Sequence, residues 1–120
     1  MKPIEGPGKV LICTVKDDIH DIGKNIVVAL LRVEGYEVFD LGKDVSTKEI
    51  LGKVAAWFRD IVGLSALLTT TMPRQREVIT AIMKAGLREK VKVMIGGAPT
   101  TDEWAEEIGA DGWALMWCLQ

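Results

Sequence analysis

The chain has 120 residues, the length of a single domain. Its 15 basic and 17 acidic side chains give a formal net charge of −2, which excludes the large basic surface of a nucleic-acid-binding protein and a polybasic membrane patch. Two cysteines, Cys13 and Cys118, exclude a disulfide framework, and a single histidine, His20, argues against a histidine-based zinc site. Because no apolar run has the length of a signal peptide or a membrane span, we expect a soluble cytoplasmic protein with no membrane partner.

The first part of the chain predicts a strand, a helix and a second strand. Residues 10–15 form a continuous β-branched and apolar run, which is typical of a strand buried on both faces. A polar loop follows over 16–23, and apolar spacing then predicts a helix from about Lys24 that Gly35 ends. Residues 36–41 predict the second strand.

The middle of the chain repeats this alternation. Ser46 with Glu49 forms a capping box, which predicts the start of a second helix. Residues 61–67 predict the third strand. A threonine-rich loop separates that strand from a third helix, whose first turn contains Pro73.

The last part of the chain completes the pattern. Residues 91–95 predict the fourth strand, which Gly96-Gly97 closes. Thr100 with Glu103 forms a second capping box for a helix, and residues 112–115 predict a fifth strand. Strands and helices that alternate with short connections predict a doubly wound, parallel, five-stranded α/β domain.

The candidate site lies in the loops that follow the strands. In parallel sheets of this kind, ligands bind outside the carboxyl ends of the strands. The loops at that edge contain the only histidine, a carboxylate pair, a run of threonines and a Gly-Gly step. Their residues are 16–23, 42–45, 68–72 and 96–100.

His20 is the first candidate residue. An imidazole that binds a metal or a substrate needs an acceptor that fixes its tautomer, and Asp18 is placed to accept from Nδ1–H. Gly23 would let a bulky ligand approach the backbone. The plainer interpretation is that His20 is a loop residue beside the start of a helix.

The carboxylates of Asp17, Asp18 and Asp21 are the second candidate. An acidic cluster after the first strand could hold Mg²⁺, as in phospho-acceptor receiver domains. That chemistry needs an aspartate after the third strand and a lysine after the fifth. The sequence has Leu67-Leu68 and Met116-Trp117 there, so a helix N-cap role for Asp21 is favoured.

The remaining candidates are small or hydroxyl-bearing residues. The three threonines at 69–71 could form a proton-linked network with the histidine, although nothing resembles a nucleophile elbow and at least one is expected to cap a helix. Ser65 is either a satisfied core hydroxyl or leaves room for something inserted beside its strand. Gly96-Gly97 predicts a tight turn or a close backbone approach, and the chain has neither a GxGxxG fingerprint nor a phosphate-binding P-loop.

Three of these motifs, in this order, resemble a known family. They are Asp18-Ile19-His20-Asp21-Ile22-Gly23, Ser65-Ala66-Leu67 and Gly96-Gly97. The arrangement resembles the cobalamin-binding domain shared by methionine synthase, corrinoid methyltransferase proteins and cobalamin-dependent mutases. The resemblance covers residues 9–114 and implies a flavodoxin-like, Rossmann-like fold.

The resemblance also implies roles for individual residues. A corrinoid would bind base-off, with His20 as the axial ligand of cobalt and Asp18 hydrogen-bonded to it. Thr71 would complete a His–Asp–hydroxyl relay, and Thr69 would contact the corrin or its tail. Ser65 and the Gly96-Gly97 step would line the slot for the displaced nucleotide tail. The residues implied at the cofactor are Asp18, Ile19, His20, Asp21, Ile22, Gly23, Ser65, Leu67, Thr69, Thr71, Gly96 and Gly97.

Within this family, the motifs are most similar to the corrinoid proteins of methanol, methylamine and methoxy-aromatic methyltransferase systems. That resemblance implies a protein that carries a methyl group on cobalt between partner methyltransferases, and so a carrier subunit rather than a complete enzyme. Two alternatives are the adenosylcobalamin module of a mutase and a non-catalytic cobalamin sensor.

The sequence departs from the family pattern in three places. Asp17 stands where a glycine is common. Residues 1–8 are expected to be a flexible lead before a cobalamin-binding domain over 9–120, without the helical cap domain that usually precedes it. The apolar segment 113–120 is expected to pair with another chain, as in a homo-oligomer, or to mark a fragment.

Overall fold

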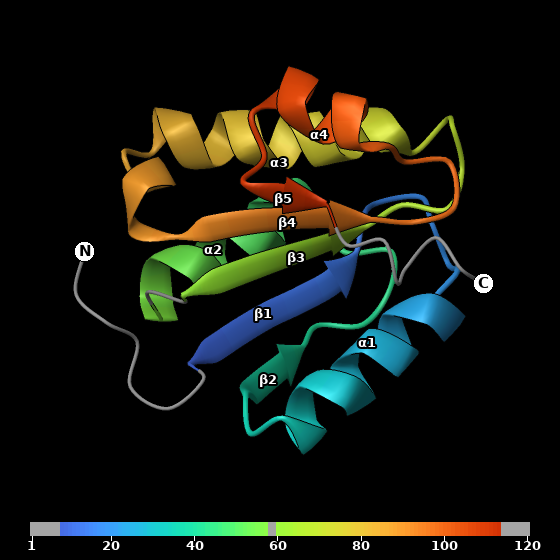
Figure 1. Cartoon of the computed structure of the whole chain (residues 1–120). Coiled ribbons are helices and arrows are strands. Elements are labelled where there is room, and N and C mark those ends of the chain that lie inside the picture. The colour runs from blue at the N-terminus through green and yellow to red at the C-terminus, as the bar shows by residue number, and fades with distance from the viewer. Residues whose placement is uncertain (1–7, 58–59, 114–120) are drawn as a thin grey trace.

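The computed structural model describes residues 8–57 and 60–113, which form alternating strands and helices (Figure 1). The strands are β1 (Lys9–Thr14), β2 (Glu37–Asp40), β3 (Ile61–Ser65), β4 (Lys92–Gly96) and β5 (Gly112–Trp113). The helices are α1 (Ile22–Val33), α2 (Thr47–Trp57), α3 (Met72–Lys84), the short 3-10 helix η1 (Arg88–Lys90) and α4 (Asp102–Ile108). This order confirms the predicted alternation.

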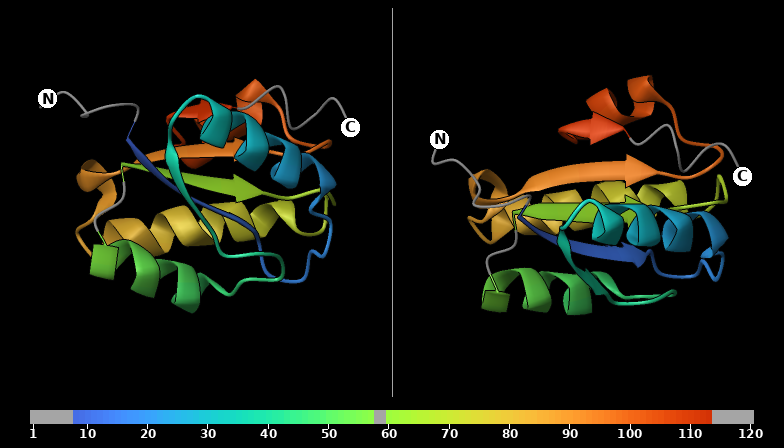
Figure 2. Two further views of the ribbon diagram at one scale, coloured as in Figure 1. Left: turned by 90° about the horizontal axis from the view of Figure 1, so that it is seen from below. Right: turned by 60° about the horizontal axis from the view of Figure 1, so that its bottom comes forward.

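The five strands form one parallel sheet in the order β2-β1-β3-β4-β5. The register pairs Thr14 with Ser65 and Ser65 with Gly96, so the carboxyl ends of the three central strands are level with one another. Helix α1 covers one face of the sheet, and α2 and α3 cover the other (Figure 2). The predicted doubly wound, flavodoxin-like architecture is therefore confirmed, and its carboxyl edge presents the loops that follow β1, β3 and β4.

Apolar side chains on both faces of the sheet hold these layers together. The larger buried cluster lies on the side of α2, α3 and α4 and includes Leu11, Leu64 and Ile95. A smaller cluster lies under α1 and includes Ile12 and Val28. Successive residues of a strand point to opposite faces, which is why the β-branched run of β1 is buried throughout. Removal of this apolar surface from water is the main force that stabilises the fold.

The helix starts differ from the expected ones in two places. Helix α4 is capped by Thr101, whose Oγ1 accepts from the backbone N–H of Trp104 at 3.0 Å, so the predicted capping box at Thr100 is wrong. Asp21 does stand at the N-cap position of α1, but its side chain makes no capping hydrogen bond. At α2 the expected cap is present, since Ser46 Oγ accepts from the N–H of Glu49 at 3.1 Å.

The chain ends lie partly outside the described residues. Of the fifth strand expected over 112–115, the structure describes Gly112–Trp113 as β5, and the apolar segment that follows falls beyond it. The expected flexible lead is likewise outside, apart from Gly8. Within the described part of the chain, no helix has the length and apolar character needed to cross a membrane.

Candidate functional site

His20 lies on the loop between β1 and α1, at the carboxyl edge of the sheet. Its side chain is 45% exposed, whereas the carboxylate of Asp18 two residues earlier is fully buried. Thr14, the last residue of β1, donates from Oγ1 to the carbonyl of His20 at 3.0 Å. The loop therefore turns back on the strand and leaves the imidazole at the surface.

Asp18 connects His20 to the loop that follows β3. Its Oδ1 accepts from the backbone N–H of His20 at 3.0 Å and lies 2.8 Å from Nδ1 of the ring. Its Oδ2 accepts from the N–H of Leu67 and from Thr71 Oγ1, both at 2.7 Å. The expected hydrogen bond between Asp18 and His20 is present, and Thr71 is the hydroxyl on the far side of the carboxylate.

These hydrogen bonds decide the ionisation of Asp18. Burial acts to raise its pKa and is the largest single effect, but the hydrogen bonds from Thr71, Leu67 and His20 together lower the pKa below its ordinary value. An ionised carboxylate can only accept, so Nδ1 of His20 must carry the proton of this contact. In the neutral ring, the lone pair is then on Nε2, which is the atom a metal would bind.

A second set of contacts fixes the start of this loop. Asp17 has a φ of 71°, in the left-handed region that favours glycine. Its N–H donates to Asp44 Oδ1 at 2.8 Å, and its carboxylate pairs with Arg74 of α3 at 2.8 Å. Lys16 pairs with the same Asp44 at 3.2 Å. The aspartate found where glycine is common is therefore held in place by residues that sequence reasoning did not identify.

The Ser65 and Gly96-Gly97 steps are buried at the ends of β3 and β4. Gly97 has a φ of 124°, and a Cβ at this position would lie 1.8 Å from the carbonyl oxygen of Ala66. The expected close backbone approach is therefore confirmed, and it is an approach to the neighbouring β3 segment. This contact requires glycine at 97 whether or not a ligand is bound.

An apolar groove of about 200 Å³ lies between α1 and the sheet. Its floor includes Gly63, which precedes Ser65 by two residues on β3 and therefore shares its side of the sheet. The groove thus follows β3 toward the carboxyl edge. Its lining residues are Val10, Ile12, Val27, Leu31, Tyr36, Ile61, Gly63 and Met94.

Three exposed aliphatic side chains lie on the His20 loop, at the start of α1 and on the loop after β3. Ile19, Ile22 and Leu68 have 65%, 73% and 41% of their surfaces exposed. Thr69 is exposed as well, whereas Gly23 is buried at the start of α1. Large exposed aliphatic side chains beside a polar loop are typical of a surface that a ligand or partner covers.

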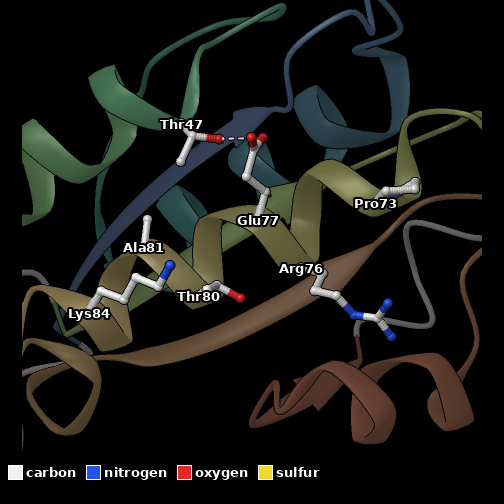
Figure 3. A pocket seen from close by; sticks show the side chains of 7 residues that line it. All are labelled: Thr47, Pro73, Arg76, Glu77, Thr80, Ala81 and Lys84. Atoms are coloured by element: carbon white, nitrogen blue, oxygen red, sulfur yellow. Dashed lines mark hydrogen bonds between the residues drawn. The ribbon is translucent and has the colours of Figure 1, made fainter.

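A larger hollow, of about 470 Å³, lies on the opposite face between α2 and α3 (Figure 3). Several polar side chains line it, and two of them are hydrogen-bonded, since Thr47 Oγ1 donates to Glu77 Oε2 at 2.9 Å. It contains none of the site residues expected from the sequence; those that line it are Thr47, Pro73, Arg76, Glu77, Thr80, Ala81 and Lys84. The chemistry expected from the sequence is therefore at the carboxyl edge, beside the apolar groove.

The described residues include no group of three or more His, Cys, Asp or Glu side chains that could hold a metal ion. A single imidazole is enough to bind a metal whose other ligands are supplied by a macrocycle. The fold and the site together define a doubly wound α/β domain with one oriented histidine at the carboxyl edge, on a loop with exposed aliphatic side chains.

Comparison with known proteins agrees with this class. A family described as "B12 binding domain" matches residues 8–115. A dimethylamine corrinoid protein of Methanosarcina mazei is 51% identical over 107 residues, which are 89% of this chain and 64% of that protein. A cobalamin-binding protein of Desulfitobacterium hafniense has a crystal structure with a TM-score of 0.86 and 43% identity, covering 89% of this chain and 52% of that one.

A third relative is the methanol:cobalamin methyltransferase complex MtaBC of Methanosarcina barkeri. Its matching chain has a TM-score of 0.84 and 35% identity, over 92% of this chain and 42% of that one. The chain belongs to the B12-binding domain family, and it is similar to the corrinoid proteins of methyltransferase systems. It spans between about two fifths and two thirds of the length of these relatives.

Proposed function

We propose that this chain binds a corrinoid base-off, with His20 as the axial ligand of cobalt, and carries a methyl group between partner methyltransferases. The observation that carries the proposal is the contact of Asp18 with His20 Nδ1 at 2.8 Å. That contact directs Nε2 away from the carboxylate, on a side chain that is 45% exposed. Among the described residues, Nε2 has no hydrogen-bond partner, as expected for a nitrogen reserved for a ligand.

Other features of the carboxyl edge fit a large flat macrocycle. The exposed side chains of Ile19, Ile22 and Leu68 offer it an apolar surface, and Thr69 is accessible for a polar contact at its rim. Ser65 and the groove beneath α1 would take the nucleotide tail, because the groove is apolar and its lining includes Gly63 and Met94, which lie two residues before Ser65 and Gly96. These side chains support the fit of the cofactor to this site.

The protein's own part in the chemistry is to hold a proton beside the ligand nitrogen. When bound, the corrinoid supplies a cobalt centre that accepts and releases a methyl group. Asp18 keeps a proton on His20 Nδ1, and Thr71 donates to the far oxygen of the same carboxylate at 2.7 Å. His20 would hold the cobalt through Nε2, and the buried, ionised Asp18 behind the ring would strengthen the donor character of that nitrogen.

The carrier role rests on the relatives. One relative is a dimethylamine corrinoid protein and another is a methyltransferase complex, so the partners proposed for this chain are methyltransferases. A cytoplasmic location follows from that proposal.

Self-association through the apolar segment 113–120 stays a prediction. Sedimentation velocity tests it, since a uniform monomer would contradict it.

The test of cofactor binding is an absorbance titration. Cobalamin added to the wild-type protein should give a spectrum that differs from the sum of the two components and saturates at one equivalent per chain. His20→Ala should remove the change that reflects the new axial ligand, and Lys92→Ala, an exposed change at the start of β4, should not. An additive spectrum for the wild type would overturn the proposal. Preferential retention of adenosylcobalamin would favour a mutase module over a methyl carrier.

A further inference from the structure

Gln75 is a fully buried polar side chain on α3 with three hydrogen bonds at the carboxyl edge of the sheet. Its Nε2 donates to the carbonyl of Leu64 at 2.9 Å and to the carbonyl of Gly96 at 3.2 Å. Its Oε1 accepts from the indole Nε1 of Trp104 at 2.9 Å. Both amide hydrogens and the amide oxygen are therefore used, and each partner belongs to a different element.

The two carbonyls that Gln75 binds lie on the strand ends where the tail slot is proposed. Leu64 precedes Ser65 on β3, and Ser65 pairs in register with Gly96 on β4. The Gly96 carbonyl also accepts from the N–H of Ala66 at 3.0 Å. Gln75 thus adds a clamp across β3 and β4 at the level of Ser65, from the face of the sheet opposite α1.

The third partner extends this clamp to α4. The ring of Trp104 lies 5.0 Å from the guanidinium carbon of Arg76, and Arg76 also pairs with Glu107 at 3.0 Å. The loop between β4 and α4 begins at Gly97. Gln75 therefore fixes both ends of that loop. It binds β4 through the Gly96 carbonyl and α4 through the Trp104 indole.

A core role alone would not require an amide. A buried amide is favourable only when its polar groups are hydrogen-bonded, and an apolar side chain of similar size would fill the same space. The Val78 and Ile82 side chains on the same helix pack in the core without polar contacts to the strand ends. The particular property of Gln75 is that it fixes the separation and direction of three elements.

From this geometry we infer that Gln75 is a positioning residue that sets the shape of the nucleotide-tail slot at Ser65 and Gly96-Gly97. The inference rests on the proposed function, since it assumes that this part of the carboxyl edge receives the tail. It predicts that loss of the Gln75 contacts weakens recognition of the tail and leaves recognition of the corrin ring by the His20 loop unchanged.

The test compares two corrinoids on the same variants. Cobalamin has the nucleotide tail, and cobinamide lacks it. For Gln75→Met, the affinity for cobalamin should fall about tenfold while the affinity for cobinamide stays within about twofold of wild type. Trp104→Phe removes one of the three hydrogen bonds and should lower the cobalamin affinity about threefold, again without an effect on cobinamide.

The controls separate positioning from stability. Ile82→Val changes a buried side chain of α3 that lies about two turns after Gln75, and it should lower the melting temperature without changing the ratio of the two affinities. Circular dichroism establishes that each variant is folded. If Gln75→Met does not fold, the ratio of cobalamin affinity to cobinamide affinity in Trp104→Phe tests the inference instead.

Equal losses for cobalamin and cobinamide, or no loss for either, would overturn the inference while leaving the proposed function in place. A wild-type protein that binds neither corrinoid would instead overturn the proposed function. The two failures are therefore distinguishable in one set of titrations.

Discussion

A single oxygen of Asp18 contacts His20 in two places. Oδ1 accepts from the backbone N–H of His20 at 3.0 Å and lies 2.8 Å from Nδ1 of its ring. The other oxygen is held by Leu67 and Thr71, which belong to the segment between β3 and α3. Both the main chain and the ring of His20 are thus oriented by a buried group before any ligand arrives, which lowers the entropy lost on binding.

The first prediction concerns Asp18 itself. In Asp18→Asn the side chain has one acceptor oxygen in place of two and cannot stabilise an imidazolium by charge. The affinity for cobalamin, measured by absorbance titration, should fall about tenfold, as is usual when the residue behind a metal-binding histidine is changed. His20→Ala should have a larger effect, and Thr71→Val a smaller one. An unchanged affinity in Asp18→Asn would contradict the orienting role of the carboxylate.

The pH dependence of stability should report the same carboxylate. Because the pKa of Asp18 in the folded chain is below its ordinary value of 3.8, the folded state is stabilised at any pH above that value. This stabilisation is lost as the pH falls through the lower folded pKa. Urea unfolding should therefore give a free-energy difference between wild type and Asp18→Asn that shrinks below pH of about 4. A difference that grows toward acid would mean that the pKa is raised instead.

Gly97 and Gly42 offer a matched pair of glycine substitutions. Both have a positive φ, of 124° and 92°, but a Cβ at 97 would meet the Ala66 carbonyl at 1.8 Å and a Cβ at 42 would meet nothing within 4 Å. Gly42→Ala should lower the free energy of unfolding by about 1 kcal/mol from backbone strain alone. Gly97→Ala should lower it by more than about 3 kcal/mol, because the β3 backbone must also move. Similar losses for the two variants would show that the close approach relaxes easily.

An ion pair with a buried lysine and a partly exposed aspartate connects α1 to β2. Lys24 Nζ, only 1% exposed, lies 2.6 Å from Asp40 Oδ1. Lys24→Met leaves the Asp40 carboxylate, which is a quarter exposed, without its cation and should lower the free energy of unfolding by about 1.5 kcal/mol. The double variant Lys24→Met/Asp40→Leu should recover much of that loss. As a control, Lys16→Met at the exposed pair with Asp44 should change stability little, and an equal effect at both sites would contradict the role of burial.

The fold could be predicted because its signals are local. The β-branched run of β1 and the glycine after α1 identify their elements without knowledge of the rest of the chain. The cap of α4 could not be predicted from the local sequence, because Thr100 and Thr101 are both suitable capping residues. In the structure, Thr100 Oγ1 donates to the Gly97 carbonyl and accepts from Trp113 Nε1 at 3.1 Å, so Thr101 caps the helix. That choice depends on a tertiary contact with β5.

The candidate site likewise contains residues that the local sequence predicts and residues that it does not. Asp18 and His20 are two residues apart, so their contact could be predicted from spacing. Arg74 and Gln75 could not, because their partners lie far away in the sequence and both residue types are ordinary on a helix surface. Thr14 was also missed, since a threonine at the end of a β-branched run fits a strand without any further role.

The most direct test of the account is electron paramagnetic resonance of the Co(II) form of the loaded protein. The protein is labelled uniformly with nitrogen-15, and the cobalamin is left unlabelled. If His20 is the axial ligand, each cobalt line should split into a doublet from one nitrogen-15 nucleus, and the doublet should vanish in His20→Ala. A triplet from the nitrogen-14 of the cofactor's own base, or the absence of nitrogen splitting, would contradict the assignment of His20 to cobalt.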